Sequence, residues 1–240
     1  MRQIRVKKDI KIAETLPADF YKNDNIFELV KEKIFVKSWQ YIGYENILPI
    51  NINLYPFTFI PNYIDEPLVL VRKQDDSISC LSNVCTHRAN IIVHNPSEQK
   101  NLRCLYHGRK FNLDGKFKSM PDFEEAKNFP RDCENLKTFP VSRLGPFFFT
   151  SLEPEFNIQK IFDEIINRLS FFKFENLVER PDLTSEHLVN ANWAIYCENY
   201  LDPFHIPFVH KELTSVLDIS NYKTEIYNNY NLQIGYSKDD

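Results

Sequence analysis

Two pairs of potential metal ligands lie close together in the first half of the chain. Cys85 and His87 are separated by one residue in CTH, and Cys104 and His107 by two residues in CLYH. Thiolate sulfur and imidazole nitrogen bind zinc and iron in proteins. Four such donors in two tight pairs predict a single metal site.

The four donors fit two kinds of site. A zinc ion would bind all four in a closed tetrahedral site. A Rieske [2Fe–2S] cluster binds two thiolates on one iron and two neutral imidazoles on the other, so that each of two facing loops presents one cysteine and one histidine. The mixed pairing favours the cluster, because a zinc finger more often groups its cysteines in one pair and its histidines in the other. We therefore expect a site that carries single electrons, with zinc as the alternative.

A second group of potential ligands follows in the last quarter of the chain. Asp202, His205 and His210 form the pattern D-x-x-H-x-x-x-x-H, which places two imidazoles and a carboxylate within nine residues. Such a set can bind a metal. The alternative is that both are surface histidines or hydrogen-bonded histidines of the core. On a regular helix the two histidines would point about 140° apart, so a shared metal requires a distorted backbone between them. Pro207 supplies a reason for that distortion, because it lacks a backbone N–H.

The elements that must position these residues change in type along the chain. Helical spacing of apolar residues predicts one helix over 25–37 and another over the segment NIQKIFDEIINRLSFF. Between them, short aromatic and β-branched runs predict antiparallel strands at YPFTFI, PLVLVRK, SISCLS and GPFFFTSL, with a turn at Asp114-Gly115. In HLVNANWAIYCENYLDPFHIPFVH a short strand should lead into a helix.

This order predicts an α+β protein with three parts. We expect an N-terminal helical segment over 1–38 and a small antiparallel β domain over 39–152 that carries the Cys/His pairs on its loops. Residues 153–240 should begin a second domain, which carries the Asp/His group.

Composition excludes several classes of protein. The formal net charge is −4, so no basic field would attract nucleic acid. The N-terminal stretch has basic residues but no apolar core, and no apolar run is long enough to span a membrane, so we expect a cytoplasmic protein that does not associate with membranes. With only 5 glycines the chain shows no dinucleotide-binding fingerprint, and a nicotinamide cofactor would have to act through another protein.

The cysteines and histidines outside the two groups are expected to be structural. Five cysteines over a long chain do not form a disulfide framework. Cys80 and Cys133 are predicted to be small buried side chains, and Cys197 to contribute to packing. His187 should lie in a strand, and His94 in an ordinary loop.

The segment CTHR, followed by CLYHGRKFNLDGKF, resembles the Rieske domain of the α subunits of Rieske non-haem iron oxygenases. The second loop of that family commonly reads C-x-Y-H-G-W-x-Y, with an Asp-Gly turn shortly after it. This chain has Arg109 in place of the tryptophan and Phe111 in place of the tyrosine. Neither position is a ligand, so the resemblance implies a [2Fe–2S] cluster on Cys85, His87, Cys104 and His107.

The resemblance also implies roles for the second group. His205 and His210, with a carboxylate, would hold a mononuclear Fe(II) that receives electrons from the cluster, and one or two atoms of O₂ would enter a small organic substrate. Asp202 would not bind the iron. It would connect His205 to His107 of the partner subunit, in a head-to-tail homotrimer supplied with electrons by a separate NAD(P)H-dependent reductase or ferredoxin.

In the same family the third iron ligand is an Asp or Glu in a helix far beyond the second histidine. No acidic residue after His210 matches that position, so we expect an incomplete, helix-grip-like catalytic domain in a shortened chain. The stretch CENYLDPFHIPFVHKEL is most similar to choline monooxygenase and related quaternary-ammonium oxygenases. Ring-hydroxylating dioxygenases are the second interpretation. An electron carrier with a vestigial iron site is the third.

Overall fold

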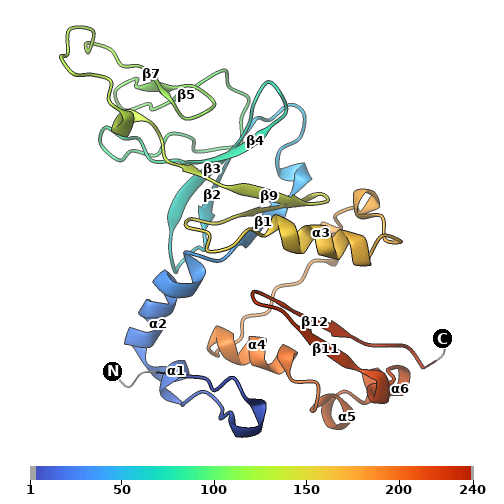
Figure 1. Ribbon diagram of the computed structural model, residues 1–240. Coiled ribbons are helices and arrows are strands. Elements are labelled where there is room, and N and C mark those ends of the chain that lie inside the picture. Colours follow the sequence, from blue (N-terminus) through green and yellow to red (C-terminus); the bar gives the residue numbers. More distant parts are fainter. Residues whose placement is uncertain (1–3, 239–240) are drawn as a thin grey trace. The chain divides into compact units, whose positions relative to one another are not determined.

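The computed structural model describes residues 4–238 of the chain. The chain divides into two compact units. One is Glu28–Thr184, and the other combines the described parts of Met1–Phe27 and Ser185–Asp240. Helices and antiparallel sheets occur together, which confirms the expected α+β class (Figure 1).

The unit Glu28–Thr184 contains ten strands. They are β1 (Gln40–Tyr44), β2 (Leu54–Phe59), β3 (Glu66–Arg72), β4 (Ile78–Ser82), β5 (Leu102–Arg103), β6 (Lys110–Phe111), β7 (Phe117–Ser119), β8 (Thr138–Phe139), β9 (Val141–Leu144) and β10 (Phe147–Thr150). They form three antiparallel sheets, in the orders β2-β3-β4-β8, β1-β10-β9 and β5-β6-β7. The four strands predicted from sequence runs are β2, β3, β4 and β10, and the Asp114-Gly115 turn joins β6 to β7.

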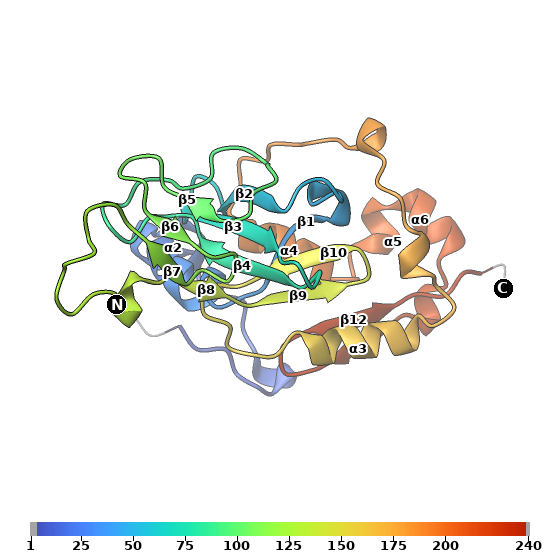
Figure 2. The same ribbon diagram turned by 90° about the horizontal axis from the view of Figure 1, so that it is seen from above.

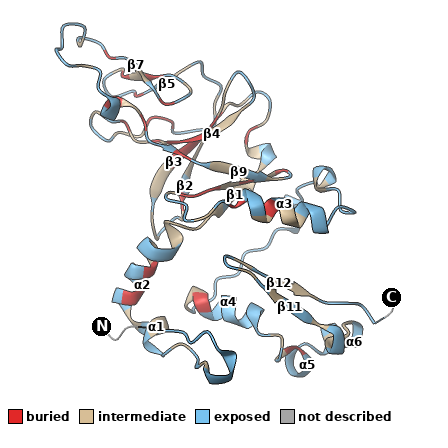
Figure 3. Cartoon of the chain, viewed as in Figure 1, coloured by how far each residue is buried: buried red, intermediate tan, exposed pale blue. Residues whose placement is uncertain are grey.

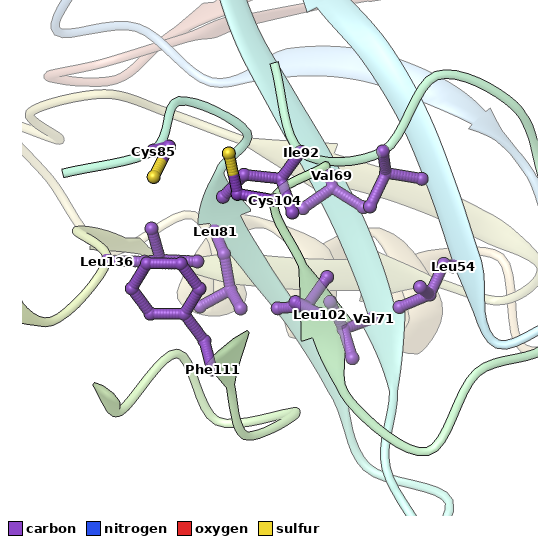
Figure 4. Close-up of a cluster of buried hydrophobic side chains, with 11 residues drawn as sticks. Leu54, Val69, Val71, Leu81, Cys85, Ile92, Leu102, Cys104, Phe111 and Leu136 are labelled. Carbon is purple, nitrogen blue, oxygen red and sulfur yellow. The ribbon is translucent and has the colours of Figure 1, made fainter. Parts of the chain in front are cut away.

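Strand β3 separates the two cores of this unit. Its run Leu68, Val69, Leu70 and Val71 is fully buried, and alternate side chains of a strand point to opposite faces. Val69 and Val71 pack in one apolar cluster with both Cys85 and Cys104, whereas Leu68 and Leu70 pack in the other (Figure 4). Figure 3 shows the buried residues of β3 and β4, whereas β2 is mostly half-buried.

Two helical segments stand before and after the ten strands in the sequence. The helix predicted over 25–37 is found as α2 (Asp24–Val30), which continues directly into a π-helical turn at Lys31–Phe35. Helix α3 (Gln159–Arg168) runs beside β9 and buries Phe162 against Phe149 of β10, with ring centroids 4.9 Å apart (Figure 2). The amphipathic spacing of this segment therefore predicted a real helix.

The other unit is mainly helical. Its helices are α1 (Asp19–Lys22), α4 (Trp193–Leu201), α5 (Ile206–Val209) and α6 (Lys211–Val216), and a hairpin of β11 (Lys223–Ile226) and β12 (Asn231–Ile234) follows them. The N-terminal segment contacts α4, because the Tyr21 hydroxyl donates to Glu198 at 2.6 Å. This hydrogen bond, with some burial, raises the pKa of Tyr21 to about 12.

Three expectations about local structure are wrong. Residues 185–190 form no strand, because they have no partner strand and their side chains are exposed, so His187 does not lie in a sheet. Cys133 and Cys197 are both exposed rather than packed. Only Cys80, at the centre of β4, is a small buried side chain as expected. Within residues 4–238, no helix has the length and apolar character to cross a membrane.

Candidate metal centres

The two Cys/His loops share one backbone design. In each loop the cysteine N–H donates to a carbonyl five residues later, from Cys85 to Asn90 and from Cys104 to Arg109, both at 2.9 Å. In each, the residue four positions after the cysteine donates back to the cysteine carbonyl and has positive φ, at Ala89 (53°) and Gly108 (74°). The bridge between Val84 and Ile91 closes the first loop, and the pairing of β5 with β6 closes the second.

The sulfur atoms of the two loops come together in the protein interior. Cys85 and Cys104 are 3 % and 2 % exposed and lie at the edge of an apolar cluster with Leu136 and Phe111 (Figure 4). Burial, together with the neighbouring Cys104 sulfur, raises the pKa of the Cys85 thiol. The Asn90 side-chain amide also donates to the Cys104 sulfur at 3.7 Å. The raised pKa favours the thiol form of Cys85, and a bound cation would stabilise its thiolate.

The imidazole rings come together on the outer side of the same loops. His87 and His107 have ring centroids 4.8 Å apart, in an edge-to-face arrangement. Burial and the neighbouring His107 lower the pKa of His87. A lowered pKa keeps the imidazole neutral near pH 7, which is the form that binds a metal.

This separation of donors fits a two-iron cluster. Sulfur lies with sulfur and imidazole with imidazole, as a cluster with two ligands on each iron requires. Among the residues that the structure describes, no group of three or more His, Cys, Asp or Glu side chains forms a ready site for a metal ion. The donor arrangement therefore favours the cluster over the zinc alternative.

Arg109 and Glu134 form a charged pair beside these loops that the sequence reasoning missed. The Arg109 side chain is 2 % exposed and its Nη2 lies 2.6 Å from Oε2 of Glu134, which is 8 % exposed. Hydrogen bonds from Arg109 and Arg131 lower the pKa of the Glu134 carboxyl. The available signal was Arg109 itself, a charged residue where the family motif has tryptophan.

The second group lies where the helix breaks, as its spacing required. Helix α4 ends at Leu201, and the short helix α5 has His205 at its N-cap and His210 at its C-cap. His210 has φ −106° and ψ 73°, which is not helical. The two rings approach each other with centroids 5.1 Å apart, so they can face a common ion.

Neighbouring side chains hold this arrangement. The Thr214 hydroxyl of α6 donates to the carbonyls of Ile206 at 3.0 Å and His210 at 2.8 Å, which ties α6 to α5. Asp202 Oδ2 lies 3.8 Å from His205 Nδ1, an ion-pair distance rather than a hydrogen bond. Its other oxygen, Oδ1, accepts from the Phe204 N–H at 2.8 Å and caps the turn before α5.

All the predicted site residues thus fall into two groups, one in each unit. The four Cys/His residues lie in Glu28–Thr184, and Asp202, His205 and His210 lie in the unit that contains Ser185–Asp240. Each group brings its histidines together, within 4.8 and 5.1 Å between ring centroids. No third metal-binding side chain joins His205 and His210 among the described residues.

Comparison with known proteins identifies relatives of this chain. Residues 53–140 match the family model of the Rieske [2Fe-2S] domain. The chain is 30 % identical, over 94 % of its length, to the carnitine monooxygenase oxygenase subunit of Escherichia coli, and covers 60 % of that protein. It is 27 % identical, over 92 % of its length, to the chloroplastic choline monooxygenase of Arabidopsis thaliana, and covers 54 % of that protein.

A solved structure supports the fold. The structure of the quaternary ammonium Rieske monooxygenase CntA with an inhibitor matches 98 % of this chain and 66 % of its own, with a TM-score of 0.74 and 20 % identity. The chain spans little more than half the length of the curated relatives it matches. Residues 53–140 match a Rieske [2Fe–2S] domain, and over nearly all of its length the chain is similar to the oxygenase subunits of carnitine and choline monooxygenases.

Proposed function

We propose that this chain is the electron-accepting and iron-binding part of a Rieske-type oxygenase that hydroxylates or demethylates a small quaternary ammonium compound. Cys85 and Cys104 would bind one iron of the cluster, and His87 and His107 the other. His205 and His210 would bind the mononuclear Fe(II). The relatives reported above act on carnitine and choline, by their names, which supports this class of substrate.

The arrangement of the four cluster ligands carries this proposal. The two cysteines are buried side by side and the two histidines meet at the exposed end of the same loops. An electron carrier needs one redox group insulated from water and one edge open to its partner. Leu105 and Tyr106, which are 74 % and 59 % exposed between the ligands of the second loop, supply an apolar rim for such a partner.

The residues of the chain have separate tasks in this reaction. When bound, the cluster supplies single electrons and the mononuclear iron supplies O₂ chemistry. The two matched loops hold the cluster ligands in hydrogen-bonded turns, and the lowered pKa of His87 favours the neutral imidazole that binds a metal. Thr214 fixes the backbone at both ends of α5, so the histidines are oriented before a metal arrives.

We further propose the assembly that the family resemblance implies. Asp202 is half exposed, at 51 %, and its Oδ2 is not engaged in a hydrogen bond with His205. It is therefore accessible to His107 of a partner subunit in a homotrimer. Electrons would come from a separate NAD(P)H-dependent reductase or ferredoxin. The cytoplasmic location and the division at residues 38/39 and 152/153 stay predictions.

Metal analysis of the anaerobically purified chain tests the site assignment. We expect two irons and two acid-labile sulfides in the cluster, plus one further iron, together with a red-brown visible spectrum. A protein that contains only zinc, or iron without acid-labile sulfide, would refute the cluster assignment. Cys85→Ser should abolish sulfide, whereas Cys133→Ser, at an exposed cysteine, should retain it.

Variants of the second group separate an oxygenase from an electron carrier. His205→Ala with His210→Ala should remove only the non-cluster iron, and His187→Ala, at an exposed histidine in the same unit, should keep it. A chain that holds two irons before and after these changes is an electron carrier. Turnover of choline or carnitine, compared with an aromatic acid, in the presence of a reductase then distinguishes the quaternary-ammonium class from the ring-hydroxylating class.

A further inference from the structure

Glu134 contacts both ligand loops, although it belongs to neither. Its backbone carbonyl accepts a hydrogen bond from the Thr86 hydroxyl at 2.9 Å, and Thr86 stands between Cys85 and His87. Its carboxylate accepts from Arg109 of the second loop at 2.6 Å. Arg109 Nη2 also approaches the same Glu134 carbonyl at 3.4 Å. One residue therefore connects the two loops whose spacing decides whether a cluster fits.

The guanidinium of Arg109 is enclosed by aromatic rings. Its Cζ lies 4.8, 5.6 and 5.7 Å from the ring centroids of Phe117, Phe111 and Phe129. Its Nε is buried without a hydrogen-bond partner among the described residues. An apolar side chain would fill this space without a counter-charge, and the family motif has tryptophan here.

We propose that the Arg109–Glu134 pair is a positioning element that clamps the two ligand loops together and sets the reduction potential of the [2Fe–2S] cluster. The proposal rests on the cluster ligation proposed above, because the pair acts on a redox group held by those four residues.

The sign of the effect follows from charge. In the oxidised cluster two ferric ions, two sulfides and two thiolates sum to zero charge. Reduction adds one electron and breaks no bond, so the cluster becomes negative. The positive charge of Arg109 stabilises the reduced cluster and raises its potential, whereas the negative charge of Glu134 does the reverse. Both side chains are shielded from water, so solvent screens their charges only weakly.

Arg109 is part of the second ligand loop itself. It stands two residues after His107, and its backbone carbonyl accepts a hydrogen bond from the Cys104 N–H at 2.9 Å. The guanidinium charge is therefore attached directly to the loop that holds two of the four cluster ligands.

The test is a redox titration of the purified chain with its cluster, by dithionite at fixed pH, followed by the visible and electron paramagnetic resonance spectra. Arg109→Met should shift the midpoint potential downward and Glu134→Gln should shift it upward. The double variant should return close to the parent. Arg103→Met removes an exposed positive charge from the same hairpin and should leave the potential unchanged.

Opposite shifts distinguish this role from a structural one. If the pair only supports the fold, both single variants that keep their cluster shift the potential in the same direction, and the proposal is wrong. An unchanged potential in Arg109→Met overturns it as well.

Two variants at exposed positions cover the case in which the buried variants do not hold a cluster. Arg131 is the second positive partner of Glu134 and its side chain is 68 % exposed. Arg131→Gln should lower the midpoint potential by less than Arg109→Met would. Thr86→Val breaks the link to the Glu134 carbonyl and should accelerate the loss of acid-labile sulfide to a chelator. The proposal fails if Arg131→Gln has the midpoint potential of the parent and Thr86→Val loses sulfide at the rate of the parent.

The two proposals fail in different ways. A parent chain without acid-labile sulfide refutes the cluster assignment itself. A parent chain with two irons and two sulfides, whose potential ignores Arg109 and Glu134, refutes only the role of the pair.

Discussion

Replacing Glu134 by Gln should destabilise the protein more than any exposed charge substitution. The change leaves the Arg109 guanidinium, 2 % exposed, without its counter-charge. Removal of one partner of a buried ion pair costs about 3–5 kcal/mol. The glutamine oxygen can still accept one hydrogen bond and the three phenyl rings remain, so we expect the lower end, about 3 kcal/mol.

The structure also predicts an asymmetry between the two partners. Arg109→Met leaves Glu134 with a second partner, because Arg131 Nη2 lies 2.8 Å from its Oε1. Glu134→Gln leaves Arg109 with no anionic partner among the described residues. The glutamate variant should therefore lose more stability than the arginine variant. A double variant, Arg109→Met with Glu134→Leu, should come within about 1 kcal/mol of the parent, since apolar replacement of a buried pair is often neutral.

Urea unfolding of the metal-free proteins measures these differences, with thermal unfolding as a second assay. A loss of about 3 kcal/mol corresponds to a melting temperature lower by about 6–12 °C. Glu155→Gln is the matched control, because Glu155 forms an ion pair with Lys37 at 2.9 Å but its side chain is 67 % exposed. This substitution should lower the free energy of unfolding by less than about 1 kcal/mol. Equal losses in Glu134→Gln and Glu155→Gln would refute this account of the buried pair.

Three other changes have defined outcomes. The pKa of the Glu134 carboxyl is lower in the folded protein than its ordinary value of 4.5, so its ion pairs stabilise the fold above pH 4.5. This stabilisation is lost as the pH falls through the pKa of the folded state. The free energy of unfolding of Glu134→Gln should therefore decrease less in acid than that of the parent. Gly108→Ala places a Cβ 3.3 Å from Pro121 at a φ of +74°. It should lower the free energy of unfolding by about 1–2 kcal/mol and accelerate the loss of acid-labile sulfide. An alanine variant as stable as the parent would show that this position does not require glycine. Thr214→Val removes the hydrogen bonds to the carbonyls of Ile206 and His210 and should lower the free energy of unfolding by about 1 kcal/mol. It should also weaken binding of the non-cluster iron, measured by equilibrium dialysis. Unchanged iron affinity would show that α5 does not need this support.

The sequence alone predicted the metal-binding residues of this protein and the type of most of its helices and strands. Two mixed Cys/His pairs predicted the cluster because ligand identity and short spacing are local properties of a loop. The run Leu68, Val69, Leu70 and Val71 predicted a strand, and the breaks around Pro207 were expected because a regular helix would separate the two histidines. Each of these inferences depends on neighbours in the sequence.

Tertiary structure decided what depends on neighbours in space. The strand expected near His187 is absent because no other strand pairs with it, and a β-ladder needs a partner. Cys80 is buried, whereas Cys133 and Cys197 are exposed. The residue type is the same at all three positions, so the surrounding elements decide which cysteine is buried. Glu134 lies 25 residues after Arg109, and only the folding of the 131–137 segment against both ligand loops brings its charge to the buried guanidinium.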